Sequence, residues 1–252
     1  MDRLKRSRWL VAAVTAGAMV ATPFAATGGR ARRLLTPATV VGLAATTMGS
    51  SAARWGGRRA AVAVVATTTV THAVERLGVR TAFPFGRYAY RPTLQPQIGG
   101  VPAVVPLAWL AMAVPAREVA HAALAGNSTP ARRIVGGAFA LTAWDLFLDP
   151  QMTHEGYWAW SGRGRYRGIP ATNFLGWLVT GIVVMTFLEV ALPAGDTSAA
   201  LVAQYAAVGG MESAAFATFF DDRLVATVGS AAMLPLAAVA LLRVRAASGG
   251  VR

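Results

Sequence analysis

Long apolar runs separated by short polar segments dominate this chain of 252 residues. Several runs extend over about 17 to 22 residues with few or no charges, which is the length needed to cross a hydrocarbon core about 30 Å thick. Backbone groups in lipid must be bonded within their own segment, so each run is predicted to form a helix. The predicted spans are Trp9–Ala26, Pro37–Ala53, Ala60–Val74, Val101–His121, Ile134–Leu148, Phe174–Leu192, Ala199–Phe219 and Leu224–Leu242.

These runs predict an all-α fold, a polytopic membrane helix bundle of about eight (seven to eight) transmembrane helices. We expect a single integral membrane domain over residues 1–252, placed as a multi-pass protein in the cell membrane and surrounded by membrane lipids. The spans Pro37–Ala53 and Ala60–Val74 are rich in small residues, which allow helices to approach closely, so we expect them in the bundle interior. The run Ala199–Phe219 is the least regular, because it is interrupted by Gln204, Gly209, Gly210 and Glu212.

The order of the spans predicts which connections lie together. The basic segment Met1–Arg8 before the first run is typical of a signal peptide, either cleaved or retained as an anchor, and the spans that follow favour retention. The connections Glu75–Gly100 and Asp149–Asn173 are the third and the fifth, so we expect them to emerge on the same face of the membrane.

Composition supports the membrane interpretation and excludes some functions. Apolar residues make up 55% and charged residues 14% of the chain, whereas soluble domains carry about 25% charged residues. The net charge of +13 comes from short arginine clusters between apolar runs, which is the pattern of loops at an anionic membrane surface rather than of a nucleic-acid-binding face. Cysteine is absent, so thiolate nucleophiles, disulfides and cysteine-ligated metals are excluded.

Residues 83–177 differ from the rest of the chain in their density of aromatic, acidic, glycine and proline residues. Lipid-facing helices need only simple apolar side chains, so this composition is not explained by membrane insertion alone. We therefore place the functional core at about residues 70–180. The segments concerned are Phe83–Tyr90, Asp145–Pro150, Trp158–Trp160, Tyr166–Pro170 and Asn173–Trp177.

Asp145 and Asp149 are four residues apart at the end of the fifth predicted span, so they share one helix face. Pro150 is expected to end that helix, because the residue before a proline is disfavoured in the α region. Acidic residues in a span usually face the bundle interior or a water-filled cavity. Two partly desolvated carboxylates close together favour retention of a proton by one of them, which suits a general acid. In the alternative, structural interpretation, Asp149 pairs with Arg163 or Arg165 and Asp145 bonds a neighbouring helix.

Glu75 is a third candidate acid. It shares a helix face with His72 and leads into the loop Phe83–Tyr90, so it can approach the aspartates. A metal site would need further ligands, and His121 and His154 do not stand at a ligand spacing, so no metal site is predicted.

Two pairs of aromatic residues alternate in the loops. Tyr88 and Tyr90 would project to one side of an extended segment, and so would Trp158 and Trp160. An interfacial aromatic belt explains any one of these residues. Two pairs on the same face, each flanked by glycine and proline, favour a shaped aromatic wall instead.

Asn173 and Trp177 share a helix face at the start of the sixth predicted span. Asn173 either caps that helix or turns toward a site, and the spacing alone does not decide between them. Glu118, Glu189 and Glu212 stand near predicted span ends and are interpreted as interfacial.

At these residues the chain resembles the membrane-integral carotenoid 1,2-hydratase family, also called carotenoid biosynthesis proteins. The elements that carry the resemblance are Pro-Phe-Gly-x-Tyr-x-Tyr, Asp-Leu-x-x-Asp-Pro, Trp-x-Trp and Gly-Ile-Pro-x-x-Asn-Phe-x-Gly-Trp, which stand here between Pro84 and Trp177. An acidic residue before the first element corresponds to Glu75. The resemblance covers about residues 70–180 and implies a bundle of seven or eight spans.

The resemblance implies a hydro-lyase that adds water across the terminal 1,2 double bond of an acyclic ψ-end of a C40 or C50 carotenoid. A general acid, one of Asp145, Asp149 or Glu75, would protonate carbon 2. Water held by a second carboxylate or by Asn173 would then add to the tertiary cation at carbon 1. The substrate-binding residues would be Phe85, Tyr88, Tyr90, Trp158, Trp160, Tyr166 and Trp177.

The same chemistry involves no redox change, and the chain has no phosphate-binding loop or dinucleotide fingerprint, so no cofactor is expected. The expected partners are the carotenoid substrate in the bilayer, membrane lipids and other carotenoid-pathway enzymes, without nucleic acid.

Three other functions stay open. A non-catalytic carotenoid-binding or assembly subunit would keep the aromatic residues without needing the acids. A proton-coupled transporter would usually show broken helices or paired half-repeats, which we do not find in the sequence. A carotenoid cyclase would also protonate an end group, but would form a ring of unchanged mass.

Overall fold

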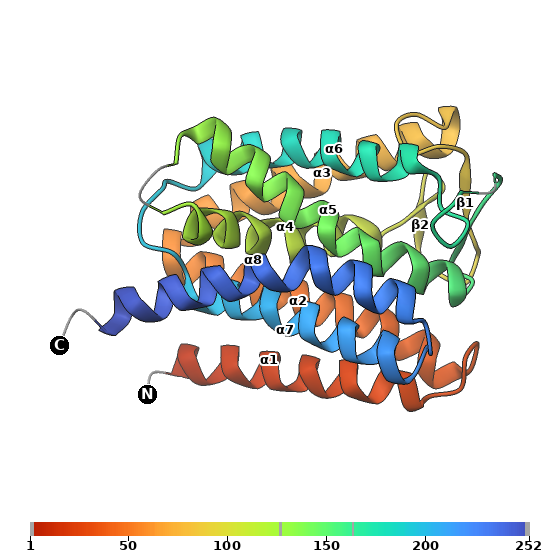
Figure 1. The fold of residues 1–252 in the computed structure, drawn as a ribbon, viewed down its shortest axis with the longest axis horizontal. Helices are drawn as coiled ribbons and strands as arrows, with labels where there is room; N and C mark the ends of the chain where they lie inside the picture. The colour runs from red at the N-terminus through yellow and green to blue at the C-terminus, as the bar shows by residue number, and fades with distance from the viewer. Residues whose placement is uncertain (1–2, 126–127, 163, 250–252) are drawn as a thin grey trace.

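The computed structural model of the protein describes residues 3–125, 128–162 and 164–249. Within these ranges eight α helices run along the long axis of the bundle, and α1 and α8 bring the two termini to the same end (Figure 1). The all-α fold is thus confirmed. The helices are α1 (Arg3–Ala21), α2 (Arg30–Trp55), α3 (Gly57–Thr81), α4 (Val104–Ala123), α5 (Pro130–His154), α6 (Ala171–Ala191), α7 (Ala199–Thr218) and α8 (Arg223–Gly249).

Two small sheets cover the end of the bundle that lies away from the termini (Figure 1). Strand β1 (Tyr88–Tyr90) pairs antiparallel with β4 (Trp158–Trp160). Strand β2 (Gln97–Ile98) pairs with β3 (Val101–Pro102). Because β1 follows α3 and β4 follows α5, these two connections lie at the same end of the bundle, as predicted; that this end is one face of the membrane stays a prediction. A single 3-10 turn, η1 (Thr22–Phe24), follows α1 on the same side.

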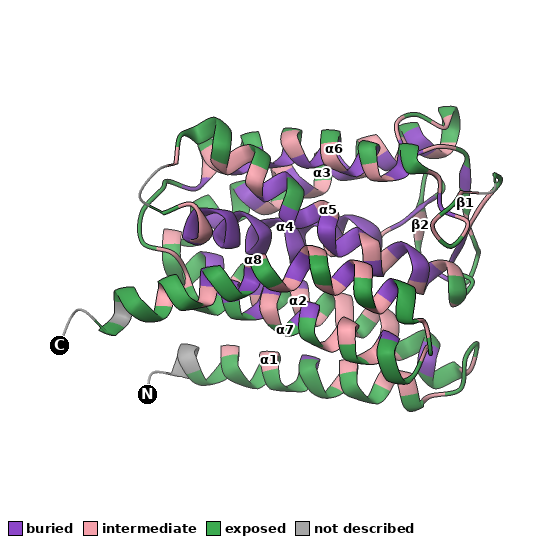
Figure 2. Cartoon of the chain, viewed as in Figure 1, coloured by how far each residue is buried: buried purple, intermediate pink, exposed green. Residues whose placement is uncertain are grey.

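Helix α4 is the centre of the bundle. It is buried over most of its length (Figure 2), and it packs against every helix from α2 to α8. The expectation that the small-residue spans of α2 and α3 form the interior is wrong, since each of these helices buries only one face. Helix α7 runs without interruption from Ala199 to Thr218, although its sequence contains two adjacent glycines.

Pro150 does not end α5, which continues to His154, so that prediction is also wrong. A proline inside a helix leaves the carbonyl four residues earlier without its N–H donor. Here the carbonyl of Leu146 accepts a hydrogen bond of 2.8 Å from the Tyr166 hydroxyl instead. Tyr166 thus compensates for the missing donor and lets the helix continue past Pro150.

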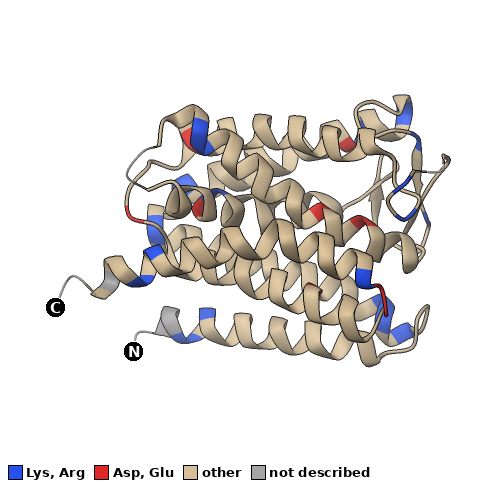
Figure 3. Cartoon of the chain, in the orientation of Figure 1, with Lys and Arg blue, Asp and Glu red and all other residues tan. Residues whose placement is uncertain are grey.

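The outer surface of the bundle is rich in apolar side chains. Val190 is 83% exposed, and Val179, Val183 and Phe187 on the same helix are exposed as well. Large exposed apolar surfaces mark contact with a membrane or a partner. Basic residues gather toward the two ends of the bundle and leave its middle nearly free of Lys and Arg (Figure 3).

Among the described helices, two are long and apolar enough to cross a membrane by themselves. They are Ala171–Ala191, with a mean hydropathy of 2.0, and Arg223–Ala247, with a mean hydropathy of 2.1. The crossing of the membrane by all eight helices stays a prediction.

A buried group of charged residues holds the end of the bundle near the termini. Arg117 donates to Glu118 over 2.7 Å and to the carbonyl of Leu192 over 2.6 Å. The other oxygen of Glu118 accepts from the backbone N–H of Ser198. Glu118 is therefore a buried structural residue that fixes the α6–α7 connection, and its interpretation as interfacial is wrong. Glu189 joins the same group by accepting from His121 and Arg133.

Candidate active site

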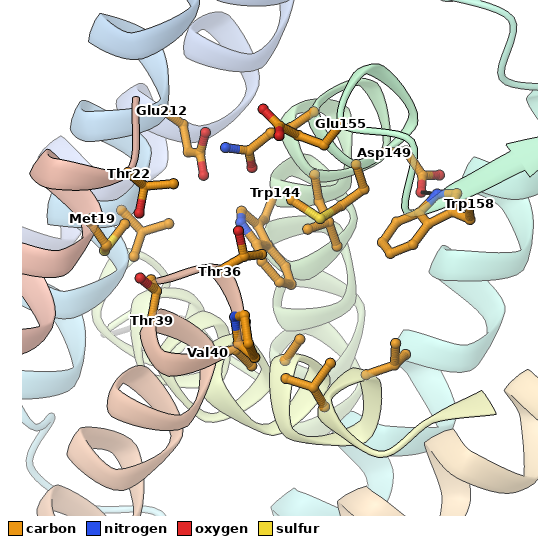
Figure 4. A pocket seen from close by; sticks show the side chains of 18 of the residues that line it. Met19, Thr22, Thr36, Thr39, Val40, Trp144, Asp149, Glu155, Trp158 and Glu212 are labelled. Atoms are coloured by element: carbon orange, nitrogen blue, oxygen red, sulfur yellow. Dashed lines mark hydrogen bonds between the residues drawn. The ribbon is translucent and has the colours of Figure 1, made fainter. Parts of the chain in front are cut away.

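A cavity of about 330 Å³ lies inside the bundle, beside the β1–β4 sheet, and its wall is mainly apolar. Asp149 and Trp158 lie on one side of it, and Met19, Thr22 and Glu212 lie on the other, with Trp144 between them (Figure 4). Most of the residues that the sequence singled out line this cavity. They are Glu75, Phe85, Tyr88, Tyr90, Asp149, Trp158, Trp160, Asn173 and Trp177.

Asp145 and Asp149 converge on the side chain of Asn173. The amide nitrogen of Asn173 donates to Asp145 over 2.8 Å and also to Asp149. Asp149 faces the cavity and accepts a second bond of 3.0 Å from the indole of Trp158. Asp145 lies behind Asn173 and is fully buried. The three side chains form one unit, in which Asp149 is the carboxyl group that a ligand can reach.

This arrangement decides between two earlier interpretations. Helix α6 begins after Pro170, and Asn173 makes no capping bond, because its amide is turned toward α5. The alternative in which Asp149 pairs with Arg165 is not realised, because both Asp149 oxygens are bonded to Trp158 and Asn173. Arg163 lies outside the described residues.

Glu75 is held by three donors. Its Oε2 atom accepts from the hydroxyls of Tyr88 and Tyr90, the second over 2.7 Å, and its Oε1 atom accepts from the indole of Trp109 over 2.9 Å. Three donors to one buried carboxyl group fix its position. Burial and the nearby Glu75 carboxylate raise the pKa values of Tyr88 and Tyr90 well above the ordinary tyrosine value, so both stay protonated.

The β1–β4 sheet joins the two acidic positions. Tyr90 stands opposite Trp158 in the register, and their rings meet edge to face with centroids 5.6 Å apart. Tyr90 bonds to Glu75, while Trp158 bonds to Asp149. The cross-strand pair of Tyr90 and Trp158 therefore positions the carboxyl groups of both Glu75 and Asp149 at the wall of one cavity. Tyr90 and Trp158 can meet because the aromatic residues of each strand project to one side, as the sequence predicted.

Phe85 lines the cavity, and its ring packs between two glycines. A Cβ atom at Gly78 of α3 would lie 2.9 Å from the Phe85 ring, and one at Gly176 of α6 would lie 2.7 Å from it. Neither position tolerates a larger residue without displacing Phe85. The glycine in the Asn-Phe-x-Gly-Trp element is explained by this close approach.

Two tryptophans that we did not predict as site residues complete the wall. Trp109 of α4 stacks on Trp177 with centroids 3.7 Å apart, and Trp144 of α5 meets Trp177 edge to face. Trp144 directly precedes Asp145, which is a signal that could have drawn attention to it. Trp109 stands in a uniform apolar run and could not have been distinguished there.

Asp145 and Tyr166 are the two predicted site residues that do not line the cavity. Asp145 bonds to Asn173 behind the cavity wall, and Tyr166 contacts the backbone of α5 and the ring of Phe174. In the described ranges, histidine and acidic residues form no group of three or more that could hold a metal ion.

The fold and the cavity define a helical-bundle protein whose apolar, aromatic-walled pocket carries buried carboxyl groups. The chain matches the family described as "Carotenoid biosynthesis protein" over residues 34–244, and it belongs to that family.

A curated relative from Haloarcula japonica, named bisanhydrobacterioruberin hydratase, is 29% identical to the chain over 121 residues. The match covers 47% of this chain and 41% of the relative, so it spans about two fifths of the relative's length. No solved structure is significantly similar to the chain.

Proposed function

We propose that the protein is a carotenoid hydratase that adds water across the terminal 1,2 double bond of an acyclic C40 or C50 carotenoid. The observation that carries this proposal is the position of Asp149 and Asn173 on the wall of an apolar, aromatic cavity. A hydratase acting on a hydrocarbon end needs an acid, a place for water and an apolar pocket, and this cavity supplies all three. The relative's name points to the same reaction class.

The proton comes from the pair Asp145 and Asp149. Two carboxylates that converge on one amide in a buried site cannot both be charged without a large electrostatic penalty, so the pair shares a proton. Asp149 donates this proton to carbon 2, and the electrons of the double bond form the new C–H bond. Carbon 1 becomes a tertiary cation. The N–H groups of Asn173 and Trp158 stabilise the Asp149 carboxylate that is left, and the new positive charge at carbon 1 offsets its negative charge.

Water is held by the oxygen of the Asn173 amide. Both N–H groups of Asn173 are directed at the aspartates, so its oxygen is the group left to accept a bond from water. A water bound there is close to Asp149 and can reach carbon 1 when carbon 2 receives the proton. After it adds, the water loses a proton to the Asp145–Asp149 pair, which returns to its starting state. The net change is the addition of one water molecule.

The aromatic wall protects and stabilises the cation. Faces of tryptophan and tyrosine rings attract a positive charge, and Trp158, Trp160 and Trp177 line the cavity together with Glu75. The three donors to Glu75 occupy its oxygens and hold its carboxyl group at a fixed position on the cavity wall, so it does not act as a base.

The size of the cavity indicates how a long substrate binds. At about 330 Å³ it is at the small end of ligand pockets, so it encloses one end of the carotenoid while the rest extends outward. Phe24 and Phe219 line the cavity and are 72% and 51% exposed, which marks the side where the polyene leaves toward the lipid. In this account the protein is a multi-pass protein of the cell membrane.

The test is pigment analysis after expression in cells that accumulate lycopene and in cells that accumulate an acyclic C50 carotenoid. A product heavier by one water for each processed end supports the proposal and identifies the chain length of the substrate. A ring product of unchanged mass would indicate a cyclase. Unchanged pigment bound to the purified protein would indicate a binding protein.

A further inference from the structure

The wall of the cavity contains, apart from the Asp149 unit, buried polar atoms that have no partner within the described residues. The indole nitrogen of Trp144, the hydroxyl of Thr39 and the Oε2 atom of Glu212 are buried, and none of them makes a hydrogen bond within the described residues. They come from α5, α2 and α7, and all three side chains line the cavity. Trp144 is only 5% exposed. Figure 4 shows Glu212 and Thr39 on the side of the cavity away from Asp149.

Glu212 does not take part in the ion pair on the cavity wall. Arg32 also lines the cavity, and its nitrogens are bonded to Glu155 and to the carbonyls of Thr22 and Ala25. Glu212 is therefore not part of this ion pair, and its interpretation as an interfacial residue is wrong because it lines an internal cavity. A buried polar atom without a partner destabilises the protein, so an occupant that bonds these atoms is favoured.

The three groups match the hydrogen-bonding capacity of water. The Trp144 N–H donates, the Glu212 carboxylate accepts, and the Thr39 hydroxyl does either. A buried water typically makes about three hydrogen bonds and needs roughly 10–15 Å³, and the cavity offers far more space than that. Acidic residues within membrane helices usually face water-filled cavities.

We infer that Glu212, Thr39 and Trp144 form a water-binding station that keeps water in the cavity and supplies it to Asn173 during the reaction. The inference rests on the proposed hydratase function, which consumes one water in each turnover. A polyene end that fills the apolar part of the cavity excludes bulk water, so the supply must come from groups that hold water in place. Glu212 acts here as a positioning residue.

Three variants test the station. Glu212→Leu removes the acceptor, Thr39→Val removes the hydroxyl at constant shape, and Trp144→Phe removes the N–H while keeping a ring. Each is expected to lower kcat by about 2- to 12-fold, the equivalent of one lost hydrogen bond, with KM for the carotenoid unchanged. Glu212→Gln still bonds water and is expected to keep most of the activity. Thr46→Val is the matched control on α2, because Thr46 bonds only its own helix and does not line the cavity.

Three kinetic outcomes would overturn the inference. The first is full activity of Glu212→Leu and Thr39→Val. The second is a Glu212→Gln variant as inactive as Glu212→Leu, which would make Glu212 a proton donor. The third is a raised KM with unchanged kcat, which would make this wall a binding site for a hydroxyl group of the substrate.

A structure of the wild-type protein at a resolution that shows water separates this inference from the proposed function. Ordered water bonded to Glu212, Thr39 and Trp144, and its loss in Glu212→Leu, supports the station even if no carotenoid is hydrated. An unoccupied wall in the wild type overturns the station even if hydration is observed.

Discussion

Replacing Asp149 by asparagine should remove most of the activity and leave the fold intact. The carboxyl group of Asp149 is the one acid of the pair that faces the cavity, while Asp145 is fully buried behind Asn173. An amide at position 149 keeps the size of the side chain but cannot donate the proton.

The magnitudes follow from the contacts. Loss of a general acid lowers kcat by about 100- to 10,000-fold. Asp145→Asn leaves that acid in place and removes one charged hydrogen bond of the unit, worth about 1.5–3 kcal/mol, so a fall of roughly 10- to 150-fold is expected. In Asp149→Asn the amide oxygen of the new side chain still accepts from Trp158. Its NH₂ group then faces the NH₂ group of Asn173, and two donors cannot bond each other. That conflict costs about 1–3 kcal/mol, which is less than the usual total stability of about 5–15 kcal/mol.

The assay is the initial rate of hydrated product in membrane vesicles that contain an acyclic carotenoid, normalised to the amount of folded protein. Asp196→Asn is the matched control, because Asp196 is exposed in the α6–α7 connection at the other end of the bundle. The reasoning is refuted if Asp149→Asn keeps more than about a tenth of the wild-type rate, or if Asp145→Asn is the more damaging of the two.

Further predictions follow from the neighbouring contacts. Asn173→Leu should lower kcat by about 10-fold or more with little change in KM, because it deprives both aspartates of their shared donor; a changed KM with normal kcat would contradict this role. Glu75→Gln should lower the thermal midpoint of the solubilised protein by about 2–4 °C for each kcal/mol lost, since at least one of three donors loses its acceptor; an unchanged midpoint would show that these bonds do not stabilise the fold. The raised pKa values of Tyr88 and Tyr90 mean that the unfolded chain releases these protons near pH 10 and the folded chain does not. Stability is then fully present below about pH 10 and falls as the pH rises further. Replacement of both tyrosines by phenylalanine should flatten that fall in a series of midpoints against pH, and an equally steep fall would count against it.

Much of the site could be predicted because it depends on local spacing and on connectivity. The four-residue spacing of Asp145 and Asp149 places them on one face of any helix, and odd-numbered connections lie on the same side of a bundle. Those two rules and the alternation of the aromatic residues place both aromatic pairs at one end of the bundle, but the pairing of Tyr90 with Trp158 is set by the strand register.

The remaining features depend on contacts between distant segments. Pro150 ends a helix by local rules, yet here Tyr166 supplies the missing bond from another part of the chain. The place of Trp109 between Glu75 and Trp177 requires knowledge of the packing of α3, α4 and α6. Glu212 stands near the end of its helix in the sequence, and only the position of α7 beside the cavity reveals its orientation.

The most direct test of the proposed chemistry is isotopic analysis of the product formed by purified protein in liposomes. The reaction would be run in water labelled with oxygen-18 and, separately, in heavy water. Protonation followed by water capture predicts a tertiary hydroxyl at carbon 1 that carries solvent oxygen, and a non-exchangeable deuterium at carbon 2. A hydroxyl oxygen that comes from dioxygen, or a hydrated product without deuterium at carbon 2, would contradict it.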